Sequence, residues 1–456
     1  MFELLNVLND YLWTYVVVTL LVFCALYFTL RLKGVQFRMI GNMIKVIVEK
    51  PGDQRIGAFQ AFAVSLSSRV GTGNLAGVAS AIFVGGPGAV FWMWMMALFG
   101  AATAFVEATL AQLYKRKGED SFYGGPAYYM QYGLHRKWMG VLFAILITIT
   151  FGMANQVVQS NTLCDALADS LAIDAKWIGL TITIATLIII FGGIRRISHF
   201  ASIVVPFMAI GYVIIAVIVI LLNITEIPAM IVLILKSAFG LEQAVGGAFG
   251  VAVMQGVKRG LFSNEAGEGS APNAAAVATV SHPVKQGLIQ ALGVFTDTLV
   301  VCSCTAFIIL VSGVDVTASN GIQLTQDALT HEIGSIGNPF VAVMICLFAF
   351  SSIIGNYYYG ETNVRYIRDS KLGVFIYRLA VAAMVMVGAV VSLDFAWSFA
   401  DITMALLTLC NLVAIVLLSR QAVFLLQDYR QQKKEGKNPV FCKDKMPEIA
   451  DKLEAW

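Results

Sequence analysis

The residues whose types and spacing could do chemistry lie in the stretch SLSSRVGTGNLAGVA, residues 65–79. An arginine, two glycines in a G-x-G and an asparagine interrupt an apolar run, from Phe62 to Val84, that is long enough to cross a membrane. A lone G-x-G would favour helix packing, but polar groups accompany these glycines at membrane depth. Unpaired backbone groups are costly there, so such a break is tolerated only where it lines a cavity or binds a ligand. The stretch RVGTGN therefore predicts a binding site built from backbone.

A second glycine-interrupted stretch, VGGAFG at residues 245–250, runs on into QGVKRGLFSNEAGEGSAPNAAA. A break in a helix exposes N–H groups at the start of the new helix and carbonyl groups at the end of the old one. The N–H end suits an anion such as a carboxylate. The carbonyl end suits a cation such as Na⁺ or an ammonium group.

Four charged residues are expected at membrane depth, and such residues are costly and mark function by default. They are Arg69, Glu107, Asp297 and Asp401. Arg69 is a candidate to pair with Glu265 or Asp401 and so to close an inner gate. Glu107 and Asp297 could equally be structural partners, and none of the four is assigned to a substrate.

The elements that position these residues must be membrane helices. The chain has 456 residues, of which 58% are hydrophobic and 13% charged, whereas soluble domains carry about 25% charged residues. A spanning helix needs roughly 20 apolar residues. The sequence then predicts an all-α polytopic membrane protein with eleven spans: 11–32, 58–84, 87–113, 139–160, 177–193, 200–222, 243–258, 286–312, 338–359, 374–392 and 396–419.

Alternate connections between these spans are rich in lysine and arginine, which predicts the orientation. By the positive-inside rule, the N-terminus lies outside and the C-terminus lies in the cytoplasm. The tail, residues 420–456, is expected to be a solvated cytoplasmic segment, and the net charge of +3 reflects the topology and does not suggest nucleic-acid binding. The segment FSNEAGEGSAP, residues 262–272, is expected on the cytoplasmic side, either as part of an inner gate or as a plain capped loop.

The spans divide into an extra N-terminal helix and two sets of five. Each set opens with a glycine-interrupted helix, and because five is odd the two sets have opposite orientations. This is the pattern of inverted-topology repeats whose broken helices meet at mid-membrane. The predicted divisions are 1–57 for the first helix and its connection, 58–222 and 223–419 for the repeats, and 420–456 for the tail.

Five stretches resemble the alanine or glycine:cation symporter family, the sodium:alanine symporters: SSRVGTGNLAGVA, GGPGAVFWMWMMALFGAATAFVEATLAQLYK, GGPAYYM, FSNEAGEGSAPNAAA and FAFSSIIGNYYYGE. The resemblance covers residues 35–420. It implies the 5+5 inverted-repeat fold of the bacterial leucine transporter with one extra N-terminal helix, in agreement with the count of eleven. It also implies Na⁺-driven uptake of small neutral amino acids, chiefly alanine and glycine, across the bacterial plasma membrane.

The resemblance extends to the G-x-G-N break of the sodium-coupled amino-acid and neurotransmitter transporters. On that basis the N–H groups of Thr72, Gly73 and Asn74 are assigned to the substrate carboxylate, which the absence of side chains at Gly71 and Gly73 allows to approach.

Further substrate contacts are expected from two other helices. Gly246 and Gly247 could leave carbonyl groups free for the substrate ammonium. Phe249 and Met254 are candidates for the wall that faces the substrate side chain, although ordinary packing is an equal alternative. Gln156 could hydrogen-bond the substrate.

In related transporters, carbonyl groups just before the break hold sodium, and here they would belong to Ser67 and Val70. Ser351 and Ser352 match the hydroxyl groups that complete that site. Their alternative role is to hydrogen-bond their own helix. Na⁺ is thus the expected coupling ion, and no other cofactor is expected.

A proton-coupled symporter of the same fold is the main alternative. A lysine or carboxylate often replaces sodium in such relatives, and the four predicted ligands contain neither, which favours sodium. A different small amino acid as substrate is a further alternative. An enzyme lacks support because no H-E-x-x-H, G-x-S-x-G or paired histidines occur. A channel is disfavoured because a broken-helix site binds and occludes its ligand. No cysteine pair has metal or redox spacing, so no transition metal is expected.

Overall fold

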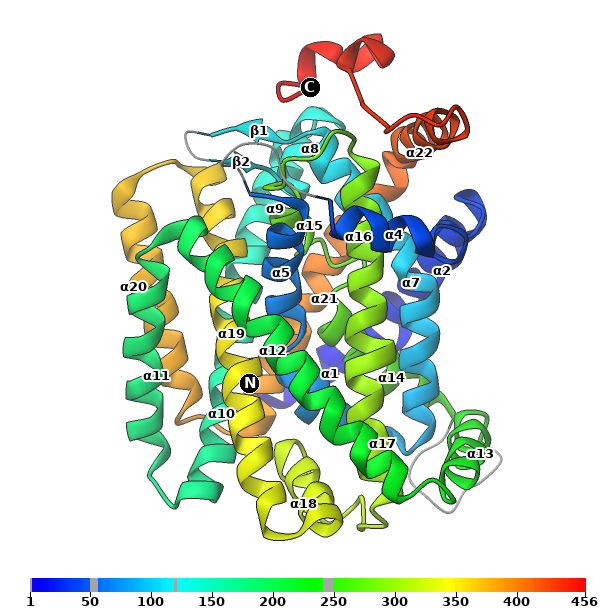
Figure 1. Cartoon of the computed structure of the whole chain (residues 1–456). Coiled ribbons are helices and arrows are strands. Elements are labelled where there is room, and N and C mark those ends of the chain that lie inside the picture. Colours follow the sequence, from blue (N-terminus) through cyan, green and yellow to red (C-terminus); the bar gives the residue numbers. More distant parts are fainter. Residues whose placement is uncertain (1, 50–55, 119–120, 241–248) are drawn as a thin grey trace.

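The protein is a bundle of helices that run mostly along one common direction, as the computed structural model shows (Figure 1). The structure describes residues 2–49, 56–118, 121–240 and 249–456. A bilayer offers no water to exposed N–H and C=O groups, so a chain this apolar satisfies its backbone within helices. The two strands of the described part, β1 (Arg116–Lys117) and β2 (Phe122–Tyr123), form a short antiparallel hairpin.

In chain order the helices are α1 (Phe2–Tyr11), η1 (Leu12–Val17), α2 (Val18–Arg31), α3 (Val35–Arg38), α4 (Ile40–Ile47), α5 (Ala58–Arg69), η2 (Gly73–Gly77), α6 (Val78–Gly85), α7 (Gly88–Leu113), α8 (Pro126–Tyr132), α9 (Lys137–Ile149), η3 (Thr150–Ala154), α10 (Asn155–Leu171), α11 (Ala175–Ile190), α12 (Gly193–Leu222), α13 (Ile227–Ala238), α14 (Phe249–Asn264), α15 (Pro272–Ala275), α16 (Val284–Val294), η4 (Phe295–Cys302), α17 (Ser303–Val311), α18 (Ile322–Ile333), η5 (Gly334–Ile336), α19 (Gly337–Ile367), α20 (Lys371–Gly388), α21 (Leu393–Leu417), α22 (Ser419–Lys434), η6 (Lys443–Lys445) and η7 (Pro447–Lys452).

Eight helical segments of the described part are long and apolar enough to cross a membrane: Val7–Arg31, Gly88–Leu113, Lys137–Leu171, Gly193–Leu222, Val284–Val311, Ile322–Ile367, Lys371–Gly388 and Leu393–Leu417. Three shorter apolar helices join them: Gly73–Gly85, Ala175–Ile190 and Ile227–Ala238. The last of these, α13, was not predicted, because its apolar run is too short for a span. The predicted span 243–258 also differs from α14, which begins at Phe249 and ends at Asn264.

The first break lies where the sequence predicts it. Helix α5 ends at Arg69, Val70 leaves helical geometry with φ −78° and ψ 88°, and a π-helical turn, η2, begins at Gly73. A Cβ atom at Gly71 would collide with the hydroxyl of Ser352 and lie 2.9 Å from Gln159 Oε1. The chain can therefore turn here only because residue 71 has no side chain.

The second interruption within the described residues lies at 265–271, after α14, whereas the sequence placed it at 245–250. Residues 241–248, including Gly246 and Gly247, lie outside the described residues. Gly267 and Gly269 have φ values of +97° and +86°, which glycine adopts readily. The Gly267 N–H donates to Glu107 (3.3 Å), and its carbonyl accepts from Asn411 (3.0 Å).

Of the two expectations for residues 262–272, the capped loop on the cytoplasmic surface is wrong. All residues from 255 to 278 are buried, and side chains of α7 and α21 satisfy the exposed backbone at Gly267. Pairing of this kind is what allows irregular backbone inside a membrane protein.

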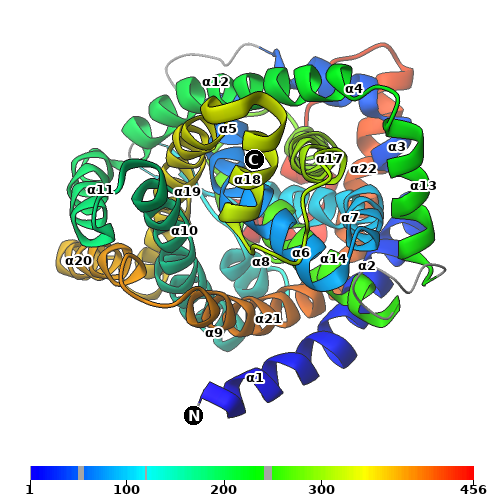
Figure 2. The same ribbon diagram turned by 90° about the horizontal axis from the view of Figure 1, so that it is seen from below.

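The two interrupted helices lie within the bundle. Seen from below, α5 and α6 are surrounded by other helices, while α11, α12, α13 and α20 lie at the rim (Figure 2). Helix α1 lies at the edge, beside α21, and the predicted first span, 11–32, corresponds to η1 and α2, which follow it. The Trp13 indole of η1 donates to the carbonyl of Asp401 (3.1 Å), which fastens this region to α21.

The two ends of the bundle differ. Helices α13 and α18 lie at one end, and the β-hairpin and α22 lie at the other (Figure 1). Most residues of the tail past Arg430 are exposed, as the sequence predicts, but the tail also contacts the bundle at a few points. The Phe441 N–H donates to the carbonyl of Ser281 (2.9 Å), and the indole of Trp456 donates to the carbonyl of Gln112 (2.9 Å). These contacts bury apolar rings that the sequence alone left without partners.

Candidate functional site

Four oxygen atoms from α5 and α19 gather where α5 ends. The Ser352 hydroxyl lies 2.9 Å from the carbonyl oxygen of Ser67 and 3.4 Å from that of Val70. The Ser351 hydroxyl lies 3.5 Å from the Ser67 carbonyl and also donates to the carbonyl of Phe348 (2.9 Å). All four predicted sodium ligands are buried and come together. Such a cluster of uncharged oxygens suits a hard cation.

A glycine allows α19 to approach α5 this closely. A Cβ atom at Gly355 would lie 2.8 Å from the Ser67 hydroxyl oxygen and 2.9 Å from the Ser68 backbone nitrogen. Contacts this short are not tolerated, so any larger residue would push the two helices apart. The cluster therefore depends on Gly355, one turn from Ser351 and Ser352, which the sequence analysis did not select.

The N–H groups on the other side of the break are partly occupied. The Thr72 N–H donates to Oε1 of Gln159 on α10 (3.0 Å), and the Asn74 N–H donates to the carbonyl of Gly71 (3.2 Å). A Cβ atom at Gly73 would lie 3.0 Å from Phe262 Cδ1 and 3.2 Å from Ser263 Cα. Of the three predicted N–H donors, the Thr72 N–H is hydrogen-bonded to a side chain, that of Gln159, which a ligand could displace.

The Asn74 side chain bridges the break and η4. Its Nδ2 donates to Asp297 Oδ1 (2.7 Å), and its Oδ1 accepts from the Gly71 N–H (2.8 Å). The other oxygen of Asp297 accepts from Ser263 (2.6 Å) and Thr298 (2.9 Å). Asp297 therefore ties η2, α14 and η4 together, in line with the structural role left open for it.

Two glutamines of α10 lie beside the site. Nε2 of Gln156 donates to the carbonyl of Ile353 on α19 (3.1 Å), and its Oε1 is buried without a hydrogen-bond partner. Gln159, one turn along α10, binds the Thr72 N–H and was not predicted. Its three-residue spacing from Gln156 was the available signal, because residues three apart are neighbours on a helix.

Phe249 and Met254 do not face the break. Phe249 is 49% exposed and contacts the Trp92 ring with centroids 5.8 Å apart. The sulfur of Met254 accepts from the hydroxyl of Thr14 in the N-terminal region. The prediction that these two side chains form the pocket wall is contradicted by their placement. They lie in the first half of α14, whereas the helix meets the break near its end.

The α14 residues beside Gly73 at the break are Phe262 and Ser263, and of these Phe262 carries a large apolar side chain. Its ring packs edge-to-face on Trp397 of α21, with centroids 4.6 Å apart. A Cβ atom at Gly77 would lie 3.7 Å from Trp397 Cη2, so Trp397 also covers the start of the helix that follows the break. Phe262 and Trp397, here called the aromatic layer, cover the break beside Gly73. On another face, α18 contacts η2 directly, because the Thr325 hydroxyl donates to the carbonyl of Leu75 (3.3 Å).

An ion-pair cluster adjoins the aromatic layer. Asp401 accepts from Lys258 (2.6 Å) and, through both oxygens, from Arg259 (3.0 and 3.3 Å). The Arg259 guanidinium also lies over the Trp397 ring, 4.0 Å from its centroid. All three charged residues are buried. These contacts join α14 to α21 on the α18 side of the break.

The predicted pairing of Arg69 with Asp401 is therefore wrong. Arg69 and Glu265 interact electrostatically, without a direct ion pair among the described residues. Arg69 is buried and donates to the carbonyl of Gln290 (3.2 Å), while its Nε and Nη2 have no hydrogen-bond partner. Glu265 accepts from the hydroxyls of Ser68 and Ser270, each at 2.6 Å. Asp401 already pairs with Lys258 and Arg259 of α14, and the order of residues in the sequence could not reveal this pairing.

Comparison with known proteins gives a family match over nearly the whole chain. The model described as the sodium:alanine symporter family matches residues 1–443. The chain is 50% identical over 446 residues to "Probable sodium/glutamine symporter GlnT" of Bacillus subtilis (strain 168), covering 97% of this chain and 93% of that protein. It is 48% identical over 455 residues to "Amino-acid carrier protein AlsT" of the same organism, covering 100% and 97%.

A further relative, "Sodium/proton-dependent alanine carrier protein" of Bacillus sp. (strain PS3), is 38% identical over 418 residues, covering 88% of this chain and 94% of that protein. Among solved structures, MhsT in complex with L-phenylalanine gives a TM-score of 0.55 at 14% identity, covering 88% and 93%. The nucleobase-cation-symport-1 family transporter Mhp1 gives 0.51 at 13% identity, covering 88% and 97%. The structural likeness shows that the chain shares their fold.

Proposed function

Because the chain belongs to the sodium:alanine symporter family, we propose that it couples Na⁺ entry to uptake of small neutral amino acids, chiefly alanine and glycine, by alternating access. The family consists of membrane transporters and not of enzymes. The observation that carries the proposal is the convergence of the Ser67 and Val70 carbonyls with the Ser351 and Ser352 hydroxyls at the first break.

Na⁺ is the ion that this cluster suits. Its four oxygens come from two carbonyl and two hydroxyl groups, and none carries a charge that could hold a transported proton. When Na⁺ binds, the Ser352 hydroxyl turns its hydrogen away from the Ser67 carbonyl and presents its lone pairs to the ion. The ion then bridges α5 and α19 and favours the arrangement in which these helices lie close.

The substrate carboxylate is assigned to the opposite side of the same break. The Thr72 N–H now donates to an uncharged amide oxygen of Gln159. A carboxylate there would form a stronger, charge-assisted hydrogen bond. Gly73, at the start of η2, adds a second N–H group, and the unpartnered Oε1 of Gln156 is available to the substrate ammonium. The Asn74 side chain does not bind the substrate in this proposal, because it donates a hydrogen bond to Asp297.

The substrate side chain is proposed to meet the aromatic layer. Phe262 contacts the break at Gly73, and Trp397 backs Phe262. Two large rings leave room for a small side chain only, which supports alanine and glycine over larger substrates. The relative named as a sodium/glutamine symporter makes glutamine the substrate to compare directly.

The remaining predictions belong to the same proposal. The α18 end is assigned to the outside by the positive-inside rule. The aromatic layer and the Asp401 cluster therefore form an outer gate, in place of the inner gate expected for Asp401. The two interruptions, at 70–72 and 265–271, support a division into inverted repeats over 58–222 and 223–419. The multi-pass chain resides in the bacterial inner membrane, with its N-terminus outside and its tail in the cytoplasm.

Uptake by purified protein in proteoliposomes tests the proposal. We expect labelled alanine to accumulate when an inward Na⁺ gradient is imposed, and unlabelled glycine to compete with it. A pH gradient imposed in Na⁺-free medium provides the matched control. Full accumulation under that control would show the proton-coupled alternative to be correct, and competition by glutamine equal to that by alanine would contradict the proposed selectivity.

A further inference from the structure

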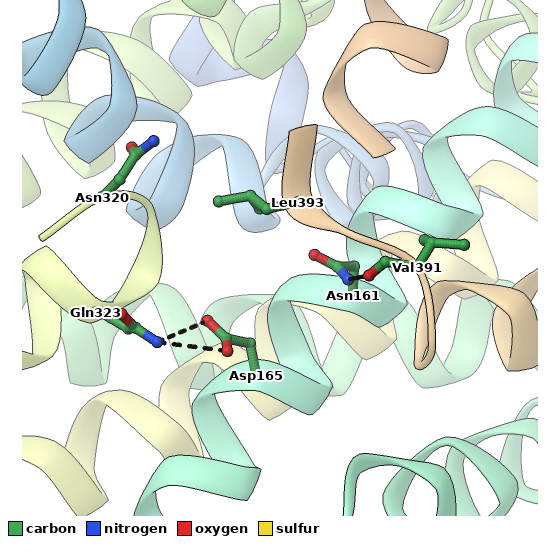
Figure 3. Close-up of a pocket in the computed structure, with 6 residues that line it drawn as sticks. All are labelled: Asn161, Asp165, Asn320, Gln323, Val391 and Leu393. Atoms are coloured by element: carbon green, nitrogen blue, oxygen red, sulfur yellow. Dashed lines mark hydrogen bonds between the residues drawn. The ribbon is translucent and has the colours of Figure 1, made fainter. Parts of the chain in front are cut away.

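A cavity of about 280 Å³ opens at the α18 end of the bundle, apart from the first break. Its walls come from α10, from the start of α18 and the chain just before it, and from the connection between α20 and α21 (Figure 3). The lining residues are Asn161, Asp165, Asn320, Gln323, Val391 and Leu393. Four of the six are polar, and one of these, Asp165, is a carboxylate.

The cavity lies on the far side of the aromatic layer from the break. Leu393 in its wall is one helical turn from Trp397 on α21. On the opposite wall, Oδ1 of Asn320 accepts from Ser80 of α6 (3.0 Å). Ser80 follows Gly73 by seven residues, which is roughly 10 Å along a helix. A molecule that reaches the break from the α18 end would meet this cavity first.

Asp165 has hydrogen-bonding capacity that the protein leaves largely unused. Each of its oxygens is 3.4 Å from Nε2 of Gln323, at the long limit of a hydrogen bond. A carboxylate can accept about four hydrogen bonds. Within the described residues Asp165 forms no ion pair, whereas its neighbour Asp169 accepts a firm hydrogen bond from Asn338 (2.7 Å).

Two amides that line the cavity are held in defined orientations. Nδ2 of Asn161 donates to the carbonyls of Gly388 (3.0 Å) and Val391 (2.8 Å), so this side chain is fixed against the wall. Oδ1 of Asn320 accepts from Ser80 and from the Gly321 N–H, which leaves its Nδ2 group to donate. The cavity therefore offers a negative charge on one side and an amide donor on the other.

We propose that this cavity is an outer recognition site for a zwitterionic amino acid. The Asp165 carboxylate accepts from the ligand ammonium, the Asn320 amide donates to its carboxylate, and Val391 and Leu393 contact its side chain. The inference rests on the proposed transport function, because it concerns the same substrate before that substrate passes the aromatic layer. It requires Asp165 to affect capture of the substrate from solution and not the later steps.

The test compares Asp165→Asn with Asp169→Asn, a matched control one helical turn away and outside the cavity. Initial uptake rates are measured in proteoliposomes as a function of amino-acid concentration at saturating Na⁺, with the amino acid that the wild type transports. We expect Asp165→Asn to raise KM roughly threefold to tenfold, as the loss of a partly exposed charge pair predicts. The value of kcat should be preserved, and Asp169→Asn should match the wild type.

Two further measurements separate the possible explanations. Asp165→Glu restores the charge, and it should return KM to within about twofold of the wild type if charge and not packing matters. The Na⁺ concentration for half-maximal uptake should be equal in Asp165→Asn and the wild type. An increase in that concentration with unchanged amino-acid KM would make the cavity a cation site and overturn the proposal.

Unchanged KM in Asp165→Asn would also overturn it, and so would equal effects of Asp165→Asn and Asp169→Asn. Wild-type uptake driven by Na⁺ would still stand in either case, so the failure of the outer site is distinguishable from failure of the proposed function.

Discussion

Ser352 on α19 and Ser67 on α5 are joined by a hydrogen bond of 2.9 Å, from the hydroxyl of the first to the carbonyl oxygen of the second. The two residues are 285 positions apart in the chain. Their contact closes the oxygen cluster at the end of α5, where the backbone leaves helical geometry. The proposed coupling between ion and substrate follows from this contact, because the same break presents the cluster on one side and the Thr72 N–H on the other.

The first prediction concerns the hydroxyl of Ser352. Ser352→Ala removes the side chain that approaches both carbonyls, so the Na⁺ concentration for half-maximal uptake should rise about fivefold, the equivalent of one lost hydrogen-bonding ligand. Ser351→Ala should have a smaller effect, since that hydroxyl is farther from the Ser67 carbonyl and donates to Phe348. The measurement is uptake rate against Na⁺ concentration. Equal curves for Ser352→Ala and the wild type would disprove the assignment.

The second prediction concerns the size of the substrate. Phe262→Ala should admit larger neutral amino acids such as leucine, because it opens space beside Gly73. A fitting methylene group contributes only about 1–3 kcal/mol, so rejection of leucine by the wild type must come from steric clash. Competition against labelled alanine measures the change. Met254→Ala is the control, since Met254 contacts Thr14 and not the break. If Met254→Ala widened the selectivity and Phe262→Ala did not, the original assignment of the pocket wall would be restored.

The third prediction concerns the Asp401 cluster. Asp401→Asn leaves Lys258 and Arg259 buried without their counter-charge, and breaking a buried pair costs about 3–5 kcal/mol. The apparent unfolding temperature in detergent should therefore fall by several degrees. Glu435→Gln is the control, because the pair of Glu435 with Lys437 is exposed to solvent and contributes little to stability. Similar unfolding temperatures for the two variants would show that the cluster does not hold α14 to α21.

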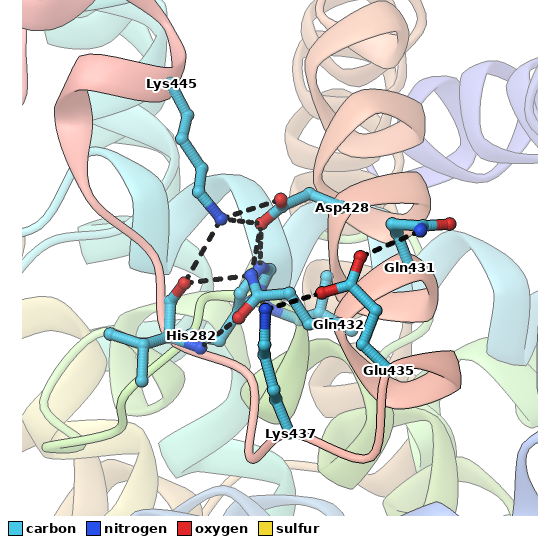
Figure 4. Close-up of polar contacts among 9 residues, drawn as sticks. His282, Asp428, Gln431, Gln432, Glu435, Lys437 and Lys445 are labelled. Carbon is cyan, nitrogen blue, oxygen red and sulfur yellow. Dashed lines mark hydrogen bonds and ion pairs between the residues drawn. The ribbon is translucent and has the colours of Figure 1, made fainter.

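The fourth prediction concerns the docking of the tail, which centres on His282 (Figure 4). Nδ1 of His282 accepts from the Val284 N–H (3.2 Å), and Nε2 lies 3.1 Å from Asp428. Burial lowers the pKa of His282 to about 4, and the nearby ammonium groups of Lys285 and Lys445 act in the same direction, while Asp428 opposes them. The histidine is therefore neutral at neutral pH, with its proton on Nε2.

Docking of the tail should weaken as the pH falls from about 6.5, the ordinary pKa of histidine, toward 4. In this range the undocked state takes up a proton on His282 that the docked state resists. Asp428 stays ionised there: burial raises its pKa, but hydrogen bonds from Lys445 and His282 outweigh this effect and lower it below the usual value. Hydrogen exchange of residues 436–456 at pH 7.5 and pH 5 measures the change. His282→Gln, which cannot titrate, should abolish the difference, and a difference that persists in this variant would assign the effect to another group.

The sequence by itself determined the features that depend on local composition. Long apolar runs with few charges specify membrane helices, and polar residues with two glycines specify the break after Arg69. The carbonyls before that break and the two serines of α19 could be named in advance, because the resemblance to a known family implied that these groups form one sodium site. Local backbone chemistry needs no knowledge of distant neighbours.

Only the tertiary structure decided which distant groups meet. Asp401 could have paired with Arg69, Lys258 or Arg259, and the position of α14 relative to α21 in the fold selected the last two. Within the described residues the second interruption lies at 265–271, where Glu107 of α7 and Asn411 of α21 satisfy its backbone at Gly267, and neither residue is near it in the chain. A polar group buried in a membrane protein is stable only where a partner reaches it, and the folded arrangement of helices determines which partner does.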